Sequence, residues 1–72
     1  MSYDEEILET LFKSRVWLTT SQVAKKVEIS WNTAESYLND LEQDQYVLHK
    51  KSGNRDLWKF NFIKWKKMKK NG

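Results

Sequence analysis

Cysteine and proline are absent from the 72-residue sequence, and glycine occurs only as Gly53 and Gly72. Without cysteine the chain has neither a disulfide framework nor a thiolate ligand for a metal, which favours a reducing, intracellular setting. His49 is the single histidine and cannot build a metal site alone. The acidic start lacks the apolar run of a signal peptide, and no segment approaches the roughly 20 apolar residues of a membrane span. We expect a soluble, cytoplasmic protein without metal or cofactor.

Combinations of residues that carry catalysis are also missing. The sequence has no glycine-rich phosphate loop, no Ser-His-Asp or Cys-His set and no zinc-ligand spacing. Its acidic residues fall mainly on predicted helices, where they indicate solvated faces. The sequence therefore predicts that the protein is not an enzyme. A chain of this length also leaves no room for a sensor domain, and we expect no small-molecule ligand.

Length and composition indicate a single folding unit. A chain of this size forms one small core at most, and no linker composition, internal repeat or long low-complexity segment divides it. We expect one domain over residues 1–72, of which residues 63–72 form a basic tail.

The net charge of +3 hides a division along the chain. Residues 1–49 hold four basic and nine acidic residues, whereas residues 50–72 hold nine basic residues and one acidic residue. A polyanion would be attracted to the C-terminal third. For the final lysines, a solvated tail that only aids solubility is an equal alternative.

Capping signals and apolar periodicity predict three helices. Apolar residues at helical spacing predict the first over about Asp4 to Ser14, preceded by Ser2 and Glu5 at capping-box spacing. Thr19 and Gln22 repeat that spacing at the start of a short second helix that ends near Glu28. Ser30 is an N-cap candidate for the third helix. The residues that we assign to the core alone are Leu8, Phe12, Ala24, Leu38, Leu41 and Val47.

After Asp44 the apolar period changes from helical to alternating. The segments QYVLHKK and RDLWKFNF predict two antiparallel strands, with SGN as the turn between them. The segment VWLT, before the second helix, predicts a short extended piece. The tail IKWKKMKKNG either extends the last strand or forms a short basic helix.

This order of elements, together with the line TTSQVAKKVEISWNTAESYLNDLEQDQYVLHKKSGNRDLWKF, resembles the winged helix-turn-helix DNA-binding domains of bacterial and archaeal transcription regulators. The small size also suggests a compact prokaryotic, archaeal, plasmid or viral genome. The similarity runs from the first helix to Phe60. Its most specific parts are Ala24 in the second helix, Ile29-Ser30 before the third, Thr33-Ala34 followed by Leu38 and Leu41 within it, and Tyr46-Val47 at the start of the hairpin.

The resemblance implies an α+β fold of three helices and a β-hairpin wing, with a short C-terminal helix as an option. It also implies binding to double-stranded DNA in transcription regulation. Two positions depart from the family. Glu28 and Gln45 stand where glycine is common, and a left-handed backbone conformation there would be strained for a residue with a Cβ atom.

In such a domain the third helix lies in the major groove. Its apolar residues Ala34, Tyr37, Leu38 and Leu41 share one side. The opposite side carries short polar side chains suited to base edges, because asparagine can bond adenine, hydroxyl groups can donate or accept, and a threonine methyl can meet thymine. Glutamate can accept from cytosine at a cost in affinity. The alternative is an ordinary solvated face. The candidates for base readout are Asn32, Thr33, Glu35, Ser36 and Asn39.

Phosphate contacts must come from other elements, because the third helix carries no basic residue. For Trp31 we expect packing or a contact with the DNA backbone rather than base readout. Arg55 or a wing lysine could enter a narrow minor groove. The candidates for backbone or wing contacts are Lys25, Lys26, Ser30, Trp31, His49, Lys50, Lys51, Asn54 and Arg55.

Three alternatives stay open at this point. A winged-helix module could bind a basic protein partner through its acidic N-terminal half, without direct DNA readout. A basic membrane-surface peptide is less well supported, because Ile63 and Trp65 would not share a helix face. These two residues could instead pack on the first helix or on a second subunit, and a homodimer would imply a palindromic DNA site.

Overall fold

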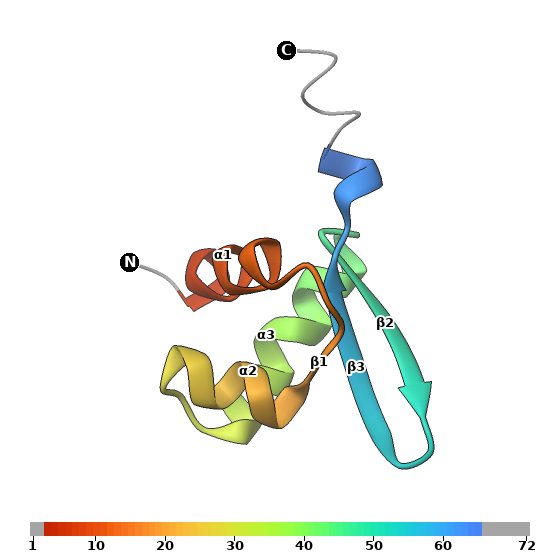
Figure 1. Cartoon of the computed structure of the whole chain (residues 1–72). Coiled ribbons are helices and arrows are strands. Elements are labelled where there is room, and N and C mark those ends of the chain that lie inside the picture. The colour runs from red at the N-terminus through yellow and green to blue at the C-terminus, as the bar shows by residue number, and fades with distance from the viewer. Residues whose placement is uncertain (1–2, 66–72) are drawn as a thin grey trace.

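The computed structural model describes residues 3–65 and has an α+β fold. Three helices come first in the chain apart from one short strand, and a β-hairpin follows (Figure 1). The elements are α1 (Tyr3–Ser14), β1 (Leu18–Thr19), α2 (Thr20–Val27), α3 (Trp31–Gln43), β2 (Val47–Ser52) and β3 (Arg55–Phe60). The sequence-based order of helix, short strand, two helices and hairpin is confirmed. The expected Ser2 cap lies outside the described residues, as does most of the tail.

The sheet has three strands rather than the two of the expected hairpin. The short β1 pairs antiparallel with β3, so the strand order is β1-β3-β2. Leu18 lies opposite Trp58, and Val47 lies opposite Phe60. The segment between α1 and α2 is therefore part of the wing sheet, and it holds the start of α2 against the hairpin.

The expected last strand, RDLWKFNF, was too long. β3 ends at Phe60, and residues 62–65 form one helical turn. Asn61 makes the change of direction, because its N–H donates to Tyr46 O and its side-chain amide donates to Gln45 O. Its carboxamide oxygen also accepts from the N–H of Lys64, as an N-cap does. Of the two options for the tail, the helical one is correct as far as residue 65.

The caps that the sequence indicates are formed. The Thr19 hydroxyl accepts from Gln22 N–H at 3.1 Å, and the Gln22 side chain accepts from Thr19 N–H at 2.9 Å. Ser30 Oγ accepts from Thr33 N–H at 3.1 Å. Both departures from the family pattern adopt the glycine conformation nonetheless, with φ of 64° at Glu28 and at Gln45. The strain expected at these two residues is therefore present.

The core lies between the three helices and one face of the sheet. Ile7 and Leu11 of α1 meet Val23 of α2 and Leu38 of α3, and Val47 and Trp58 close it from the sheet. Of the expected core residues, Ala24, Leu38, Leu41 and Val47 are buried, whereas Leu8 and Phe12 are only partly buried. Trp58 is 1% exposed, and its indole N–H donates to Thr20 Oγ1 at 2.8 Å.

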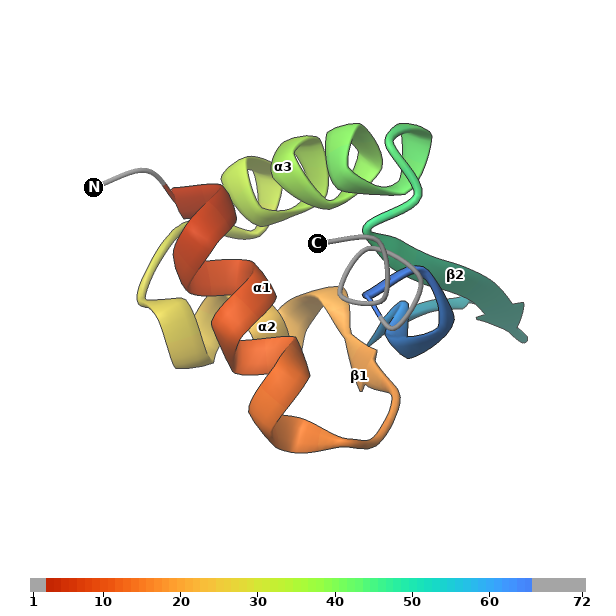
Figure 2. The same ribbon diagram turned by 90° about the horizontal axis from the view of Figure 1, so that it is seen from above.

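A second aromatic cluster joins α1 to the C-terminal turn. The ring of Phe12 lies 5.1 Å from Phe60, 5.6 Å from Phe62 and 5.5 Å from Trp65. The guanidinium of Arg15 lies 5.2 Å from the Phe12 ring centroid and 5.0 Å from that of Phe62. Trp65 thus packs on α1, as one of the sequence-based alternatives had it, while Ile63 remains 68% exposed. In the view from above, this turn stands over the start of the hairpin (Figure 2).

Candidate nucleic-acid interface

The polar ridge of α3, formed by Asn32, Ser36 and Asn39, is exposed. It lies opposite the buried stripe of Ala34, Leu38 and Leu41 because the two sets are about half a turn apart on the helix. The sequence predicts this placement through the helical period alone. The ridge is free to meet a partner surface along the length of α3.

The other two candidates for base readout are half-buried. The hydroxyl of Thr33 accepts from Ser30 Oγ at 2.8 Å, so it belongs to the cap of α3. Its methyl group is the part that remains for an apolar contact. Glu35 lies on the flank of α3 that also carries Trp31 and Glu42, and Glu42 faces β2 through His49. Glu35 is thus on the hairpin side of the ridge.

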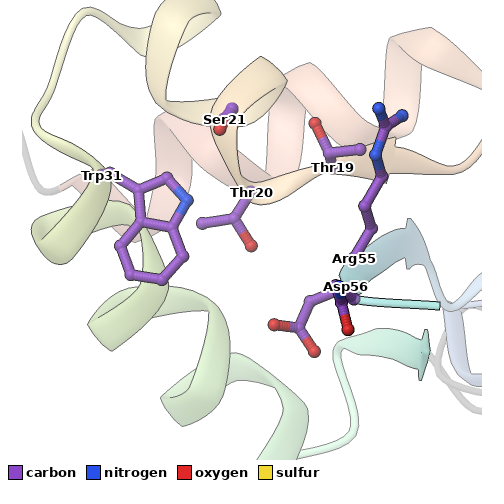
Figure 3. A pocket seen from close by; sticks show the side chains of 7 residues that line it. Thr19, Thr20, Ser21, Trp31, Arg55 and Asp56 are labelled. Atoms are coloured by element: carbon purple, nitrogen blue, oxygen red, sulfur yellow. The ribbon is translucent and has the colours of Figure 1, made fainter. Parts of the chain in front are cut away.

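Trp31 marks the place where α3, α2 and the hairpin meet. It is 44% exposed and lines a depression of about 130 Å³, which we call the α2 pocket. Figure 3 shows its indole on one side of this pocket, with Thr20 and Ser21 of α2 beside it and Asp56 across from it. The lining residues are Thr19, Thr20, Ser21, Trp31, Asn54, Arg55 and Asp56. Because Trp31 directly precedes Asn32, the polar ridge begins at the rim of this pocket.

The wing tip, residues 51–55, forms the opposite rim. A two-residue turn at Gly53 and Asn54 joins β2 to β3, and Gly53 has the φ of +64° that such a turn requires. Lys51, Asn54 and Arg55 are all exposed. Figure 1 shows the hairpin turn on the same lower side of the molecule as α2 and the start of α3. The wing tip therefore supplies positive charge next to a ridge that has none.

Arg55 also borders a second depression, together with Thr19, the N-cap of α2, and with Ser21 and Gln22 of α2. In Figure 3 its side chain extends alongside Thr19, at the N-terminus of α2. Backbone N–H groups in the first turn of a helix have no acceptor within the helix and favour negative charge. Arg55 and the α2 N-terminus thus present donors to the same solvent space.

The lysines among the candidates do not line the pocket. Lys50 and Lys51 point to opposite faces of β2 because side chains alternate along a strand. Lys50 Nζ lies 4.4 Å from the Trp17 ring centroid on the outer face of the sheet. Lys25 and Lys26 are exposed in the last turn of α2, at the end away from β1.

His49 is not an open wing residue. Its side chain is 24% exposed and stacks on Trp58 with a centroid distance of 4.2 Å and an interplanar angle of 15°. Nε2 lies 2.9 Å from Asp56 Oδ1, and Nδ1 lies 3.6 Å from Glu42 Oε2. His49 thus sits between β3 and α3, behind the surface formed by the wing tip.

Sequence reasoning missed the contribution of the α2 N-terminus to this surface. The capping box at Thr19 was recognised, but its nearness to Arg55 depends on the pairing of β1 with β3. The sequence predicted an extended piece before α2 but not the strand with which it pairs. Within residues 3–65 no group of three or more acidic or histidine side chains is arranged to hold a metal ion. The same residues include no helix that is long and apolar enough to cross a membrane.

Comparison with solved structures gives an independent view of the fold. The chain superposes on a fragment, residues 1–100, of a "possible transcriptional regulatory protein" from Mycobacterium bovis, with a TM-score of 0.80 and 16% sequence identity. The match covers 94% of this chain and 71% of that one. The chain has a winged-helix-like fold. No protein-family model and no curated protein sequence matches it.

At 16% identity the winged-helix likeness concerns the fold and not the side chains. The identities of the ridge and wing-tip residues are therefore features of this chain. In winged-helix terms, α2 and α3 are the two helices of the helix-turn-helix unit and the β2–β3 hairpin is the wing.

Proposed function

We propose that the protein binds double-stranded DNA with sequence preference and regulates transcription by occupying a promoter, without enzymatic activity. In this proposal α3 lies in the major groove, and the wing and the basic tail contact the phosphate backbone. The observation that carries the proposal is the α2 pocket, where the start of α3 and the wing tip form two rims of one depression. One duplex is thereby able to touch both.

The ridge supplies base readout in this proposal. Asn32 bonds an adenine edge in this proposal, and Ser36 and Asn39 contact bases further along the groove. Thr33 contributes its methyl group, and its hydroxyl, which accepts from Ser30 Oγ, keeps its own proton to donate. Glu35 accepts from cytosine and disfavours phosphate on the wing side of the ridge.

Phosphate contacts come from around the ridge. Arg55, Asn54 and Lys51 contact one side from the wing tip, with Ser30 and Trp31 at the start of α3. Lys25 and Lys26 contact the backbone from the far end of α2. Lys50, on the outer sheet face, joins them only where the duplex curves around the wing. His49 takes a supporting role. We propose that the protein acts in the cytoplasm.

Salt dependence of duplex binding tests the proposal. We expect the wild-type affinity to fall steeply with salt, because bound phosphates release their counterions. Replacing Lys51 and Arg55 with Gln should reduce the slope of log affinity against log salt by about 0.9 for each phosphate that the variant no longer neutralises. The matched control is Lys13→Gln, because Lys13 pairs with Glu9 on α1 and lies outside the proposed surface. Equal slopes for all three proteins would contradict the proposed wing contacts.

A winged-helix module that binds a protein partner is the second candidate. The observation that favours it is the charge of α3, whose ionisable residues are all acidic. Such a surface would attract a basic protein rather than a phosphate backbone. Absence of duplex binding at low salt, where electrostatic attraction is strongest, would favour this candidate over DNA binding.

A further inference from the structure

We infer that His49 is a positioning residue that ties the wing to α3, and that this tie depends on the charge of its imidazole. The inference deepens the proposed function and rests on it, because it concerns how the wing is held beside the ridge. His49 does not touch DNA in this proposal. It acts through Glu42 of α3 and Asp56 of β3.

The geometry assigns different roles to the two ring nitrogens. At 2.9 Å, Nε2 is within hydrogen-bond distance of the Asp56 carboxylate. A carboxylate only accepts, so Nε2 carries the proton of this bond. At 3.6 Å, Nδ1 is within ion-pair distance of the Glu42 carboxylate but too far for a good hydrogen bond.

The electrostatic interaction between His49 and Glu42 of α3 therefore changes from repulsive to attractive when the imidazole is protonated. In the neutral imidazole, Nε2 holds the only N–H group, and the lone pair of Nδ1 faces a negatively charged carboxylate. In the charged imidazole, Nδ1 also carries a proton and attracts Glu42. Protonation thus replaces a repulsion between β2 and α3 with an attraction, while the bond to Asp56 persists in both states.

The imidazole of His49 is held in place by its packing on a buried residue. The imidazole lies flat on Trp58, which is buried and bonded to Thr20 of α2. Asp56 also lines the α2 pocket, next to Arg55. His49 is therefore connected by direct contacts to two lining residues of the α2 pocket, to Asp56 directly and to Thr20 through Trp58.

Charged groups of both signs surround this link. On β2, Lys51 follows His49 two residues further along the same face, and it opposes the positive charge of the imidazole. On α3, Glu35 lies two turns before Glu42 on the same flank and adds negative charge there. Asp56 and Glu42 are the two groups in direct contact with the ring. The tie to α3 is therefore made by Glu42, whereas Asp56 fixes the imidazole on β3.

The proposal predicts that duplex affinity rises as His49 becomes charged. A histidine changes charge between about pH 5 and pH 8, so binding is compared at the two ends of that range at constant ionic strength. The probe is a 24-base-pair random-sequence duplex pool with a pH-insensitive dye, read by fluorescence anisotropy. For the full wild-type chain we expect about three- to five-fold tighter binding at the lower pH, the size expected of a partly exposed ion pair.

Two variants separate positioning from other roles. His49→Gln keeps a side-chain donor for Asp56 but has no charge to gain, so we expect its affinity to lose the pH dependence. Glu42→Gln keeps His49 and removes only its partner on α3, so we expect less than half of the wild-type change. Circular dichroism at both pH values checks that the variants are folded. Because Glu42 is exposed at the end of α3, its variant keeps the test usable if His49→Gln folds poorly.

Each of the other possible outcomes contradicts one part of the proposal. If His49→Gln keeps the wild-type pH profile, His49 has no charge-dependent role. If only Glu42→Gln keeps it, His49 contacts DNA directly and the tie to α3 is wrong. If the wild-type protein binds no duplex at either pH, the proposed function fails, and the role of His49 in it fails as a consequence.

Discussion

Individual side chains divide into those whose role follows from the sequence and those whose role needs the fold. The exposure of Asn32 follows from helical periodicity, and the cap at Ser30 follows from its residue type and place. The tie made by His49 does not, because it depends on the register that places His49 opposite Trp58 and on the path of α3 past β2. The alternating pattern of a strand predicts only which face of the sheet a polar residue occupies.

Asn32 is the side chain for which we predict the largest effect on sequence preference. Replacing Asn32 with Ala should reduce discrimination between preferred and unrelated duplexes by about 1–3 kcal/mol, because alanine cannot make the bidentate bond to adenine. Competition binding with the two duplexes measures it. Gln43→Ala is the matched control, since Gln43 is exposed at the far end of α3. Equal discrimination by Asn32→Ala and the wild-type protein would remove Asn32 from the readout.

The Trp58–Thr20 hydrogen bond should make the two residues non-additive in stability. Thr20→Val leaves the buried indole N–H without an acceptor, which should cost about 1–3 kcal/mol. Trp58→Phe leaves the Thr20 hydroxyl without its donor. The double variant should lose less than the sum of the two single losses, because no polar group is left unpaired. Urea unfolding of the four proteins tests this, and strict additivity would mean that the bond contributes nothing specific.

Among the elements, the helices, the hairpin and the short extended piece before α2 were predictable, whereas the pairing of that piece with β3 was not. The helices carry caps and an apolar period, and the hairpin carries alternation and a Gly-Asn turn. β1 is two residues long, too short for a period to show. The end of β3 was also misplaced, because the alternation of Trp58 and Phe60 continues to Phe62 in the sequence while Asn61 turns the chain.

The turns before and after α3 contain a residue in the left-handed backbone conformation that glycine usually adopts, although neither residue is glycine. Ile29 N–H donates to Ala24 O after α2, and Tyr46 N–H donates to Leu41 O after α3. These bonds between residues five apart are typical of a helix that ends in a left-handed residue. The network of bonds therefore outweighs the local strain at Glu28 and Gln45.

Replacing Glu28 with Gly should stabilise the protein. Relief of the left-handed strain is worth roughly 1–2 kcal/mol, and the added backbone freedom of glycine in the unfolded chain offsets part of it. We expect a net gain of about 1 kcal/mol and a rise in Tm of about 4–8 °C. Thermal unfolding measures it. Asp40→Gly is the control, because Asp40 is exposed within α3 at ordinary helical angles and the same change should lower Tm. A drop in Tm for Glu28→Gly would refute the strain argument.

The molecule as a whole is held at two places, the main core and the aromatic cluster around Phe12. The second place joins the first helix to the end of the described chain, so the ends of the fold stabilise each other. Lys64 also holds the C-terminal turn, because its ammonium donates to Asp44 O at the end of α3 and lies over the Tyr46 ring. From the sequence, packing of Trp65 on the first helix was one of several alternatives for the tail, because a single aromatic residue does not indicate which residues it will contact.

Trp65→Ala should lower stability by about 0.5–1.5 kcal/mol beyond the loss of buried area, because its ring packs on Phe12. Ile63→Ala is the matched control and should have little effect, since that side chain is largely exposed. Denaturant unfolding of both variants provides the measurement. A large loss for Ile63→Ala that depends on protein concentration would instead indicate that Ile63 is buried between two copies of the chain.

Selection of duplexes from a random library by the whole protein, followed by sequencing, tests whether α3 and the wing engage one duplex. We predict a short enriched motif that the Asn32→Ala variant fails to enrich, while the Lys51→Gln and Arg55→Gln double variant enriches the same motif with weaker retention. A palindromic motif would indicate a homodimer. A library that stays unenriched after binding to the wild-type protein would contradict sequence-preferring DNA binding.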